Sequence, residues 1–295
     1  MSGPMLSDLA IATDWFELAC LAQSRPLLRH SEIQRVVALA DPDMDLDQVE
    51  TAVSDILAEV QRRSVRAGAL YPFTTGLRGL HRRAVEPGVE LLYKFLALCS
   101  VAPSFRSNQV GFQPGRAFER IAAPAMGAFV AGESVVFADI DEPGVRARIR
   151  SLGRMMHIGT HETNARPSRN DHGLDVASWR PFGDRRAAHP VVLCQCTLKR
   201  THTDLILKAR EIAPGEWGRL LDVREGVFSA ALAIPHALEP GYEHWDELRS
   251  NTDLIVERVR LLSLLEDIGD PWQPLLAEES FIHDGFARWQ RRVVP

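Results

Sequence analysis

Residues that could act on a phosphate ester follow one another along one stretch of the chain. Asp175 opens an apolar run, and Gln195 and Lys199 lie at the end of the next one. A carboxylate beside an amide oxygen offers the oxygen ligands that Mg²⁺ prefers. Such a cation can activate water and neutralise charge on the scissile phosphate, and a lysine alongside would stabilise the transition state. These residue types therefore indicate metal-dependent hydrolysis of a phosphodiester.

Two predicted strands must position these side chains. Residues 174–179 and 190–197 are apolar runs, and the connector 182–189 contains the Gly-Asp and Arg-Arg pairs of a polar turn. Successive strand residues point to opposite sides of a sheet. We therefore expect adjacent antiparallel strands, with Gln195 across from Asp175.

Further elements surround this predicted hairpin. Helical spacing over 115–130 gives an apolar face that Glu119 interrupts, and Pro124 is expected to kink that helix. The expected order is helix 115–130, strand 134–138, helix 145–156, the two strands of the hairpin, helix 203–212, strand 227–234 and helix 252–268.

This order resembles the PD-(D/E)xK, or restriction endonuclease-like, superfamily of nucleases. The resemblance implies an α/β fold with an α-β-β-β-α core, a mixed sheet flanked by helices, over residues 106–235. Residues 1–105 are then a helical N-terminal region and 236–295 a helical C-terminal extension. Segments such as Tyr93–Ala97 and Ala231–Ala237 are also similar to uncharacterised bacterial proteins associated with phage defence.

The resemblance also implies roles for individual residues. Asp175 would be the principal metal ligand, with Glu119 as a second acid and the Cys196 backbone carbonyl completing the metal site. Gln195 replaces the usual glutamate, as in the Gln-x-Lys branch. Thr197 stands where the lysine is expected, so the positive charge is assigned to Lys199. Lys208, in the following helix, is the second candidate for supplying this charge.

Two classes of function follow from the resemblance. The first is a Mg²⁺- or Mn²⁺-dependent endonuclease that cleaves DNA, as the effector of an antiphage system with a co-encoded ATPase or sensor as its partner. The second is a catalytically inactive nuclease-like module that binds nucleic acid or a partner protein. A helical adaptor with an unrelated α/β core is a third alternative.

Charge is unevenly distributed along the chain, although the net charge is only −5. Residues 1–60 carry a net −8, residues 61–200 carry +10 and residues 201–295 carry −7. The basic stretch includes five arginines expected to contact nucleic acid, three of them near helical spacing: Arg146, Arg150, Arg154, Arg166 and Arg169. Such a patch is typical of a phosphate-binding surface, although a solvated helix face would have the same pattern.

The remaining observations concern the setting of the protein. No apolar run approaches the ~18 residues of a membrane span, and no signal-peptide pattern begins the sequence, so no membrane association is expected. Four cysteines, two of them in a predicted buried strand, favour a reduced, cytoplasmic location. Cys194-x-Cys196 and His157-x₃-His161 are weak zinc patterns. Residues 5–66 indicate an acidic helical or winged-helix-like module suited to a protein partner.

Overall fold

The computed structural model describes residues 4–165, 172–184, 186–187, 189–212, 214–222 and 228–293. It divides the chain into two compact units, each built from separate stretches of sequence. Unit 1 contains residues 1–114, 235–240 and 258–295, and unit 2 contains residues 115–234 and 241–257. The stretch after residue 235, which was expected to form one extension, thus contributes to both units.

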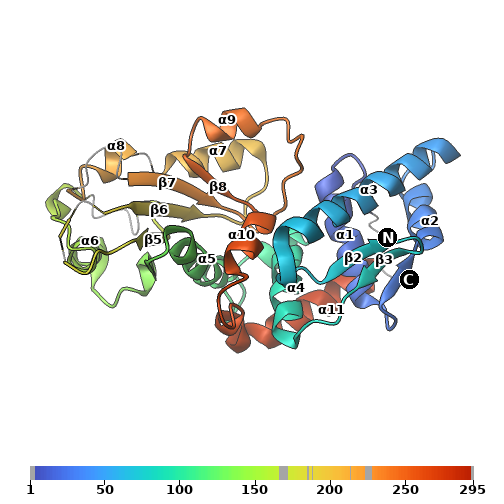
Figure 1. Cartoon of the computed structure of the whole chain (residues 1–295), viewed down its shortest axis with the longest axis horizontal. Helices are drawn as coiled ribbons and strands as arrows, with labels where there is room; N and C mark the ends of the chain where they lie inside the picture. Colours follow the sequence, from blue (N-terminus) through green and yellow to red (C-terminus); the bar gives the residue numbers. More distant parts are fainter. Residues whose placement is uncertain are drawn as a thin grey trace. The chain divides into compact units, whose positions relative to one another are not determined.

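The first part of unit 1 combines helices with a small antiparallel sheet (Figure 1). Its elements are α1 (Leu9–Ala22), β1 (Leu27–Arg29), α2 (His30–Ala40), α3 (Leu46–Ala67), η1 (Gly68–Leu70), β2 (Phe73–Gly76) and β3 (Gly79–Arg82). The strands pair in the order β1-β3-β2, which is a winged-helix arrangement. The region expected to be helical or winged-helix-like thus contains three short strands besides its helices.

The sequence analysis did not predict the short strands β1, β2 and β3 or the tight turn between β2 and β3. Gly79 has φ +131, and a Cβ at this position would lie only 2.3 Å from the Leu28 carbonyl oxygen. Only glycine allows β1 and β3 to approach so closely in this backbone conformation.

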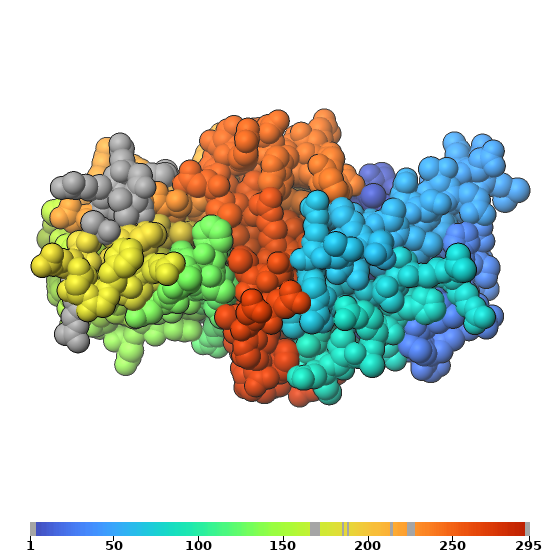
Figure 2. Space-filling model, in the orientation of Figure 1, coloured from blue at the N-terminus to red at the C-terminus, as the bar shows by residue number. Residues whose placement is uncertain are grey.

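The exposed side of α3 is acidic. Asp47, Glu50 and Asp55 are all exposed there, and no lysine or arginine occurs between residues 36 and 61. The N-terminal half of α3, which carries these residues and is light blue in the space-filling view, protrudes at the surface of unit 1 (Figure 2). A phosphate backbone would be repelled by such a face.

The rest of unit 1 is helical. It contains α4 (Pro87–Val101), η2 (Pro103–Arg106), α10 (Arg258–Leu265), η5 (Gln273–Glu278) and α11 (Glu279–Val293). The helix predicted over 252–268 was too long, because Leu254–Val256 forms a strand of unit 2 instead. These three apolar residues include two with β-branched side chains, which favour a sheet.

Unit 2 is built on a five-stranded mixed sheet with helices around it (Figure 1). Its elements are α5 (Pro114–Val130), β4 (Glu133–Val136), η3 (Phe137–Asp139), α6 (Gly144–Met155), η4 (Glu162–Asn164), β5 (Val176–Trp179), β6 (Val191–Cys196), α7 (His202–Arg210), α8 (Pro214–Trp217), β7 (Phe228–Ala233), α9 (Trp245–Arg249) and β8 (Leu254–Val256). The strand order is β4-β5-β6-β7-β8. β4, β5 and β6 pair antiparallel, whereas β6, β7 and β8 run parallel. The predicted hairpin of adjacent antiparallel strands is confirmed.

One hydrophobic cluster of unit 2 forms on one face of this sheet, whose strands β5 and β6 are buried on both faces. Trp179 of β5 and Trp217 of α8 are almost completely buried in it. Along α6 the buried residues Val145, Ile149 and Leu152 recur at helical spacing and belong to the same cluster. Because β5 and β6 contribute alternate residues to this cluster, their register is fixed by burial, and the hairpin can hold a polar pair at its end.

A candidate active site at the end of the central hairpin

Asp175 is held between two neighbouring strands. Its backbone N–H donates a hydrogen bond of 3.1 Å to the Cys194 carbonyl, and its own carbonyl accepts one of 2.8 Å from the Phe137 N–H. The register pairs Val176 with Cys194. One residue further along, Asp175 therefore lies across from Gln195, as the alternation predicted.

The carboxylate of Asp175 is fixed by two donors. Its Oδ2 accepts hydrogen bonds from Gln195 Nε2 at 2.6 Å and from the Cys196 backbone N–H at 2.7 Å. These two hydrogen bonds hold the carboxylate in one orientation.

The amide of Gln195 has a buried oxygen without a partner. Its Nε2 donates to Asp175 Oδ2 and, at 3.0 Å, to the Cys196 carbonyl. Both partners are acceptors, so the NH₂ group must face them, and the amide cannot be reversed. Gln195 Oε1 is then buried with no hydrogen-bond donor. A buried acceptor of this kind calls for a cation or a water.

Glu119 projects from α5 with its side chain 13% exposed. It forms an ion pair with Arg116, whose guanidinium also donates a 2.6 Å hydrogen bond to Asp139. Arg120 contacts the same Asp139 carboxylate at 3.0 Å. The hydrogen bond from Arg120, together with the charges of both arginines, lowers the pKa of Asp139.

Sequence reasoning did not single out Arg116 or Asp139. The i,i+3 spacing of Arg116 and Glu119 was visible in the sequence as a helical ion pair. Asp139, in contrast, reaches Arg116 only because the end of η3 lies beside the first turns of α5, which no local pattern reveals.

The thiol of Cys196 has a raised pKa. Burial is the largest cause, and the hydrogen bond with Cys194 and the negative charges of Asp175 and Glu119 raise it further. The raised pKa favours the protonated thiol, which is a poor nucleophile. The resemblance assigns Cys196 to the site through its backbone carbonyl.

The two lysines stand apart from the strand that carries Gln195. β6 ends at Cys196, and the Lys199 backbone N–H donates to Thr197 Oγ1 at 3.1 Å in the turn before α7. The expectation that Lys199 shares a strand face with Gln195 required a longer strand, so the alternation argument does not apply to it. Lys208 lies in α7 and forms a 2.9 Å ion pair with Glu211.

The arginines of α6 have partners of their own. Arg146 donates to the carbonyls of Thr163 and Ala165. Arg150 and Arg154 pair with acidic side chains, Glu162 at 2.8 Å and Glu142 at 3.1 Å, but their own side chains are 60% and 66% exposed. Arg146 is exposed as well, but its guanidinium is engaged by two backbone carbonyls, so of these three arginines Arg150 and Arg154 best match the expected phosphate-binding surface. Arg166 and Arg169 lie outside the described residues.

The rival zinc patterns do not assemble. Cys194 and Cys196 are consecutive same-face residues of one strand and have no third ligand within reach among the described residues. His157 and His161 likewise have no third ligand within reach among the described residues. In the part of the chain that the structure describes, one group of three such ligands occurs, and it is a different one.

Unit 1 contains a buried ionic network. Asp14 accepts hydrogen bonds from Arg63 at 2.6 Å and from both Nη atoms of Arg258 at 2.8 Å. Glu17 contacts Arg63 at 3.0 Å and accepts hydrogen bonds from the hydroxyls of Tyr71 and Tyr93. Burial raises the pKa of Glu17 despite the arginines. All six side chains, at most 1% exposed, satisfy one another away from solvent, which is a structural rather than a catalytic arrangement.

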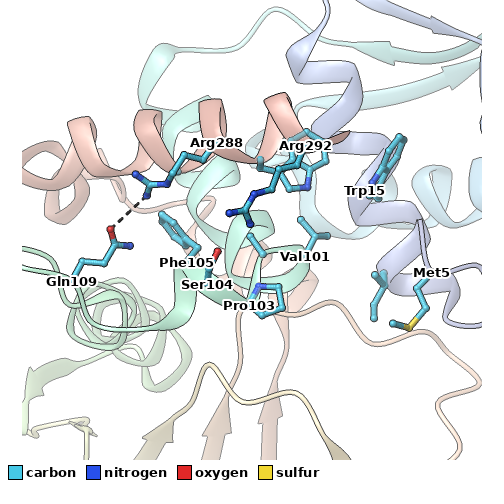
Figure 3. Close-up of a pocket in the computed structure, with 13 residues that line it drawn as sticks. Met5, Trp15, Val101, Pro103, Ser104, Phe105, Gln109, Arg288 and Arg292 are labelled. Carbon is cyan, nitrogen blue, oxygen red and sulfur yellow. Dashed lines mark hydrogen bonds between the residues drawn. The ribbon is translucent and has the colours of Figure 1, made fainter. Parts of the chain in front are cut away.

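Unit 1 also has a cavity of about 370 Å³ beside α11 (Figure 3). Its wall is mainly apolar, with Trp15, Val101 and Phe105, and two arginines, Arg288 and Arg292, lie at its border. No acidic residue, histidine, cysteine or lysine is among the described residues that line it. It therefore lacks the groups that metal-dependent or acid–base chemistry requires.

Comparisons with known proteins add no assignment. No protein-family model, curated protein or solved structure matches the chain. Among the described helices, none combines the length and the apolar character that crossing a bilayer requires.

Proposed function

We propose that this protein is a metal-dependent nuclease with a restriction endonuclease-like core, acting on DNA. The observation that carries the proposal is the end of the β5–β6 hairpin, where a doubly hydrogen-bonded Asp175 carboxylate adjoins the unpartnered buried Oε1 of Gln195. Glu119, which is paired with Arg116, would supply a second carboxylate.

The donor set fits a hard divalent cation. Asp175, Glu119, Gln195 Oε1 and the Cys196 carbonyl are all oxygen ligands, which suit Mg²⁺ or Mn²⁺. A bound cation of this kind would supply water activation and neutralise charge on the phosphate. The chain's own part is to orient Asp175 through the Gln195 and Cys196 donors, and to place the guanidinium of Arg116 against Glu119.

A second candidate function is a nuclease-like module that binds without cleaving. It is favoured by the end of β6 at Cys196, which leaves no lysine on the strand that carries Gln195. Arg116 could take the role of that lysine, but its guanidinium already forms ion pairs with both Glu119 and Asp139.

Cleavage of plasmid and linear DNA with Mg²⁺, Mn²⁺ or EDTA tests the proposal. We expect metal-dependent cleavage by the wild type and its loss in Asp175→Asn, because the amide cannot supply the anionic ligand. Asp184→Asn is the matched control, since Asp184 is exposed in the connector between the strands. Cleavage that persists in Asp175→Asn would disprove the site. DNA binding without cleavage by the wild type would favour the non-cleaving module.

A further inference from the structure

A second ligand cluster lies in unit 2, away from the hairpin residues discussed above. His202 is the first residue of α7, His244 directly precedes α9, and Glu247 lies within α9. α7 and α9 pack against each other above β7 and β8 (Figure 1). One possible ligand atom from each of the three side chains lies within 4.8 Å of the other two.

Contacts within the cluster leave one nitrogen unsatisfied. His202 Nε2 lies 2.6 Å from Glu247 Oε2, and the His202 and His244 rings stack with centroids 3.8 Å apart. His202 Nδ1 is buried and has no hydrogen-bond partner. Whichever nitrogen carries the proton, the ring therefore keeps one buried nitrogen unpaired, which costs free energy.

The stack holds the two imidazole rings side by side, with centroids 3.8 Å apart, next to the Glu247 carboxylate. Neutral imidazole is the form that binds a metal ion. The cluster thus holds two metal-binding imidazoles beside a carboxylate.

From this geometry we propose that His202, His244 and Glu247 form a binding site for Zn²⁺ or a similar transition-metal ion. Two imidazole nitrogens and one carboxylate oxygen match the ligands of Zn²⁺ and differ from the all-oxygen sets of Mg²⁺. Ligands at ~2.0–2.2 Å from zinc are roughly 3.3 Å apart in a tetrahedron. Rotation of the three side chains would bring the ligand atoms to this separation. It would also lengthen the 2.6 Å contact between His202 Nε2 and Glu247 Oε2. Glu247 is 55% exposed, so water can fill the fourth position.

Zinc here would join two segments that are distant in sequence. His202 follows β6, whereas His244 and Glu247 lie in the connection between β7 and β8. A metal bound by all three would fasten α9 to α7 and stabilise the folded state increasingly as the free metal concentration exceeds its Kd.

Calorimetric titration of the untagged full chain with Zn²⁺, together with thermal unfolding, tests the site. We expect one equivalent of Zn²⁺ to bind at this site and raise the Tm, and an excess of Mg²⁺ should not displace it, because Mg²⁺ prefers all-oxygen ligands. His244→Ala and Glu247→Gln should each weaken zinc binding at least tenfold. His283→Ala is the matched control, because His283 contacts Glu279 at 3.2 Å on α11 without a third ligand, and it should bind zinc as the wild type does.

Two further measurements separate this site from the proposed nuclease site and from misfolding. Asp175→Asn should keep zinc binding unchanged, and the metal-free Tm of His244→Ala should stay close to that of the wild type. If the metal-free Tm of His244→Ala falls, Glu247→Gln, which alters only an exposed side chain, decides the question. Equal zinc affinity in the wild type and Glu247→Gln, or no zinc binding by the wild type, would overturn the proposal.

Discussion

Gln195 is the residue on which the candidate active site depends most directly. Its amide donates to Asp175 and to the Cys196 carbonyl, and its buried oxygen has no donor. A glutamate here would give the more common pair of carboxylates, but it could not donate to Asp175. The glutamine therefore stabilises the metal-free state of the site, in which an adjacent carboxylate would repel Asp175.

Gln195→Glu should make the stability of unit 2 depend on metal. In EDTA we expect a loss of about 1–3 kcal/mol, because a hydrogen bond to a charged group is replaced by repulsion between two carboxylates. Mg²⁺ should restore much of this loss, which thermal unfolding with and without the ion measures. Gln195→Leu should be destabilised in both conditions and gain nothing from Mg²⁺. An equal response of both variants to Mg²⁺ would argue against a cation at this position.

At the scale of elements, α6 presents two exposed arginines with weak partners. Arg150 and Arg154 form surface ion pairs, which contribute little stability and can exchange for phosphate. Arg146 differs from them because it donates to two backbone carbonyls of the following loop. It is expected to hold that loop rather than to bind nucleic acid.

The double variant Arg150→Glu/Arg154→Glu should weaken DNA binding and make it less sensitive to salt. Each lost phosphate contact should reduce the slope of log affinity against log salt by ~0.9. Mobility-shift titrations at several salt concentrations measure both effects. Arg291→Glu/Arg292→Glu on α11 changes charge equally and should leave the slope unaltered. An unchanged slope in the α6 variant would remove this helix from the DNA-binding surface.

Local patterns were enough to predict the hairpin but not its surroundings. Two apolar runs and a polar connector predicted β5 and β6, and the alternation of side chains along each strand predicted the facing positions of Asp175 and Gln195. β8 was missed because its three residues are too few for a period to show. The Arg116–Asp139 contact joins α5 to the end of η3, and only the tertiary fold brings them together.

At the scale of the whole molecule, unit 1 is closed by charges from distant parts of the chain. Asp14 in α1, Arg63 in α3 and Arg258 in α10 meet in a network without solvent. Such a network is costly to disrupt, since removing one partner leaves a buried charge uncompensated.

Arg258→Met should therefore lower the free energy of unfolding by about 3–5 kcal/mol. Asp14 would lose two hydrogen bonds of 2.8 Å while remaining buried. Urea denaturation followed by circular dichroism measures the change. Arg260→Met, on the exposed side of the same helix, is the control and should alter stability little. A loss no larger than that of the control would mean that Arg63 alone compensates both acids.

The same network affects the order in which the two units can fold while the chain is being synthesised. A ribosome makes α1 and α3 early, and it then makes the whole of the sheet before Arg258 emerges. Until that point the nascent chain holds Asp14 and Glu17 against the single guanidinium of Arg63. Unit 2, whose residues are all complete by 257, can fold first, while the N-terminal segment waits for a residue 244 positions away. Translation that stops short of Arg258 leaves α1 able to contact α3 and α4, but Asp14 without the two hydrogen bonds that Arg258 donates.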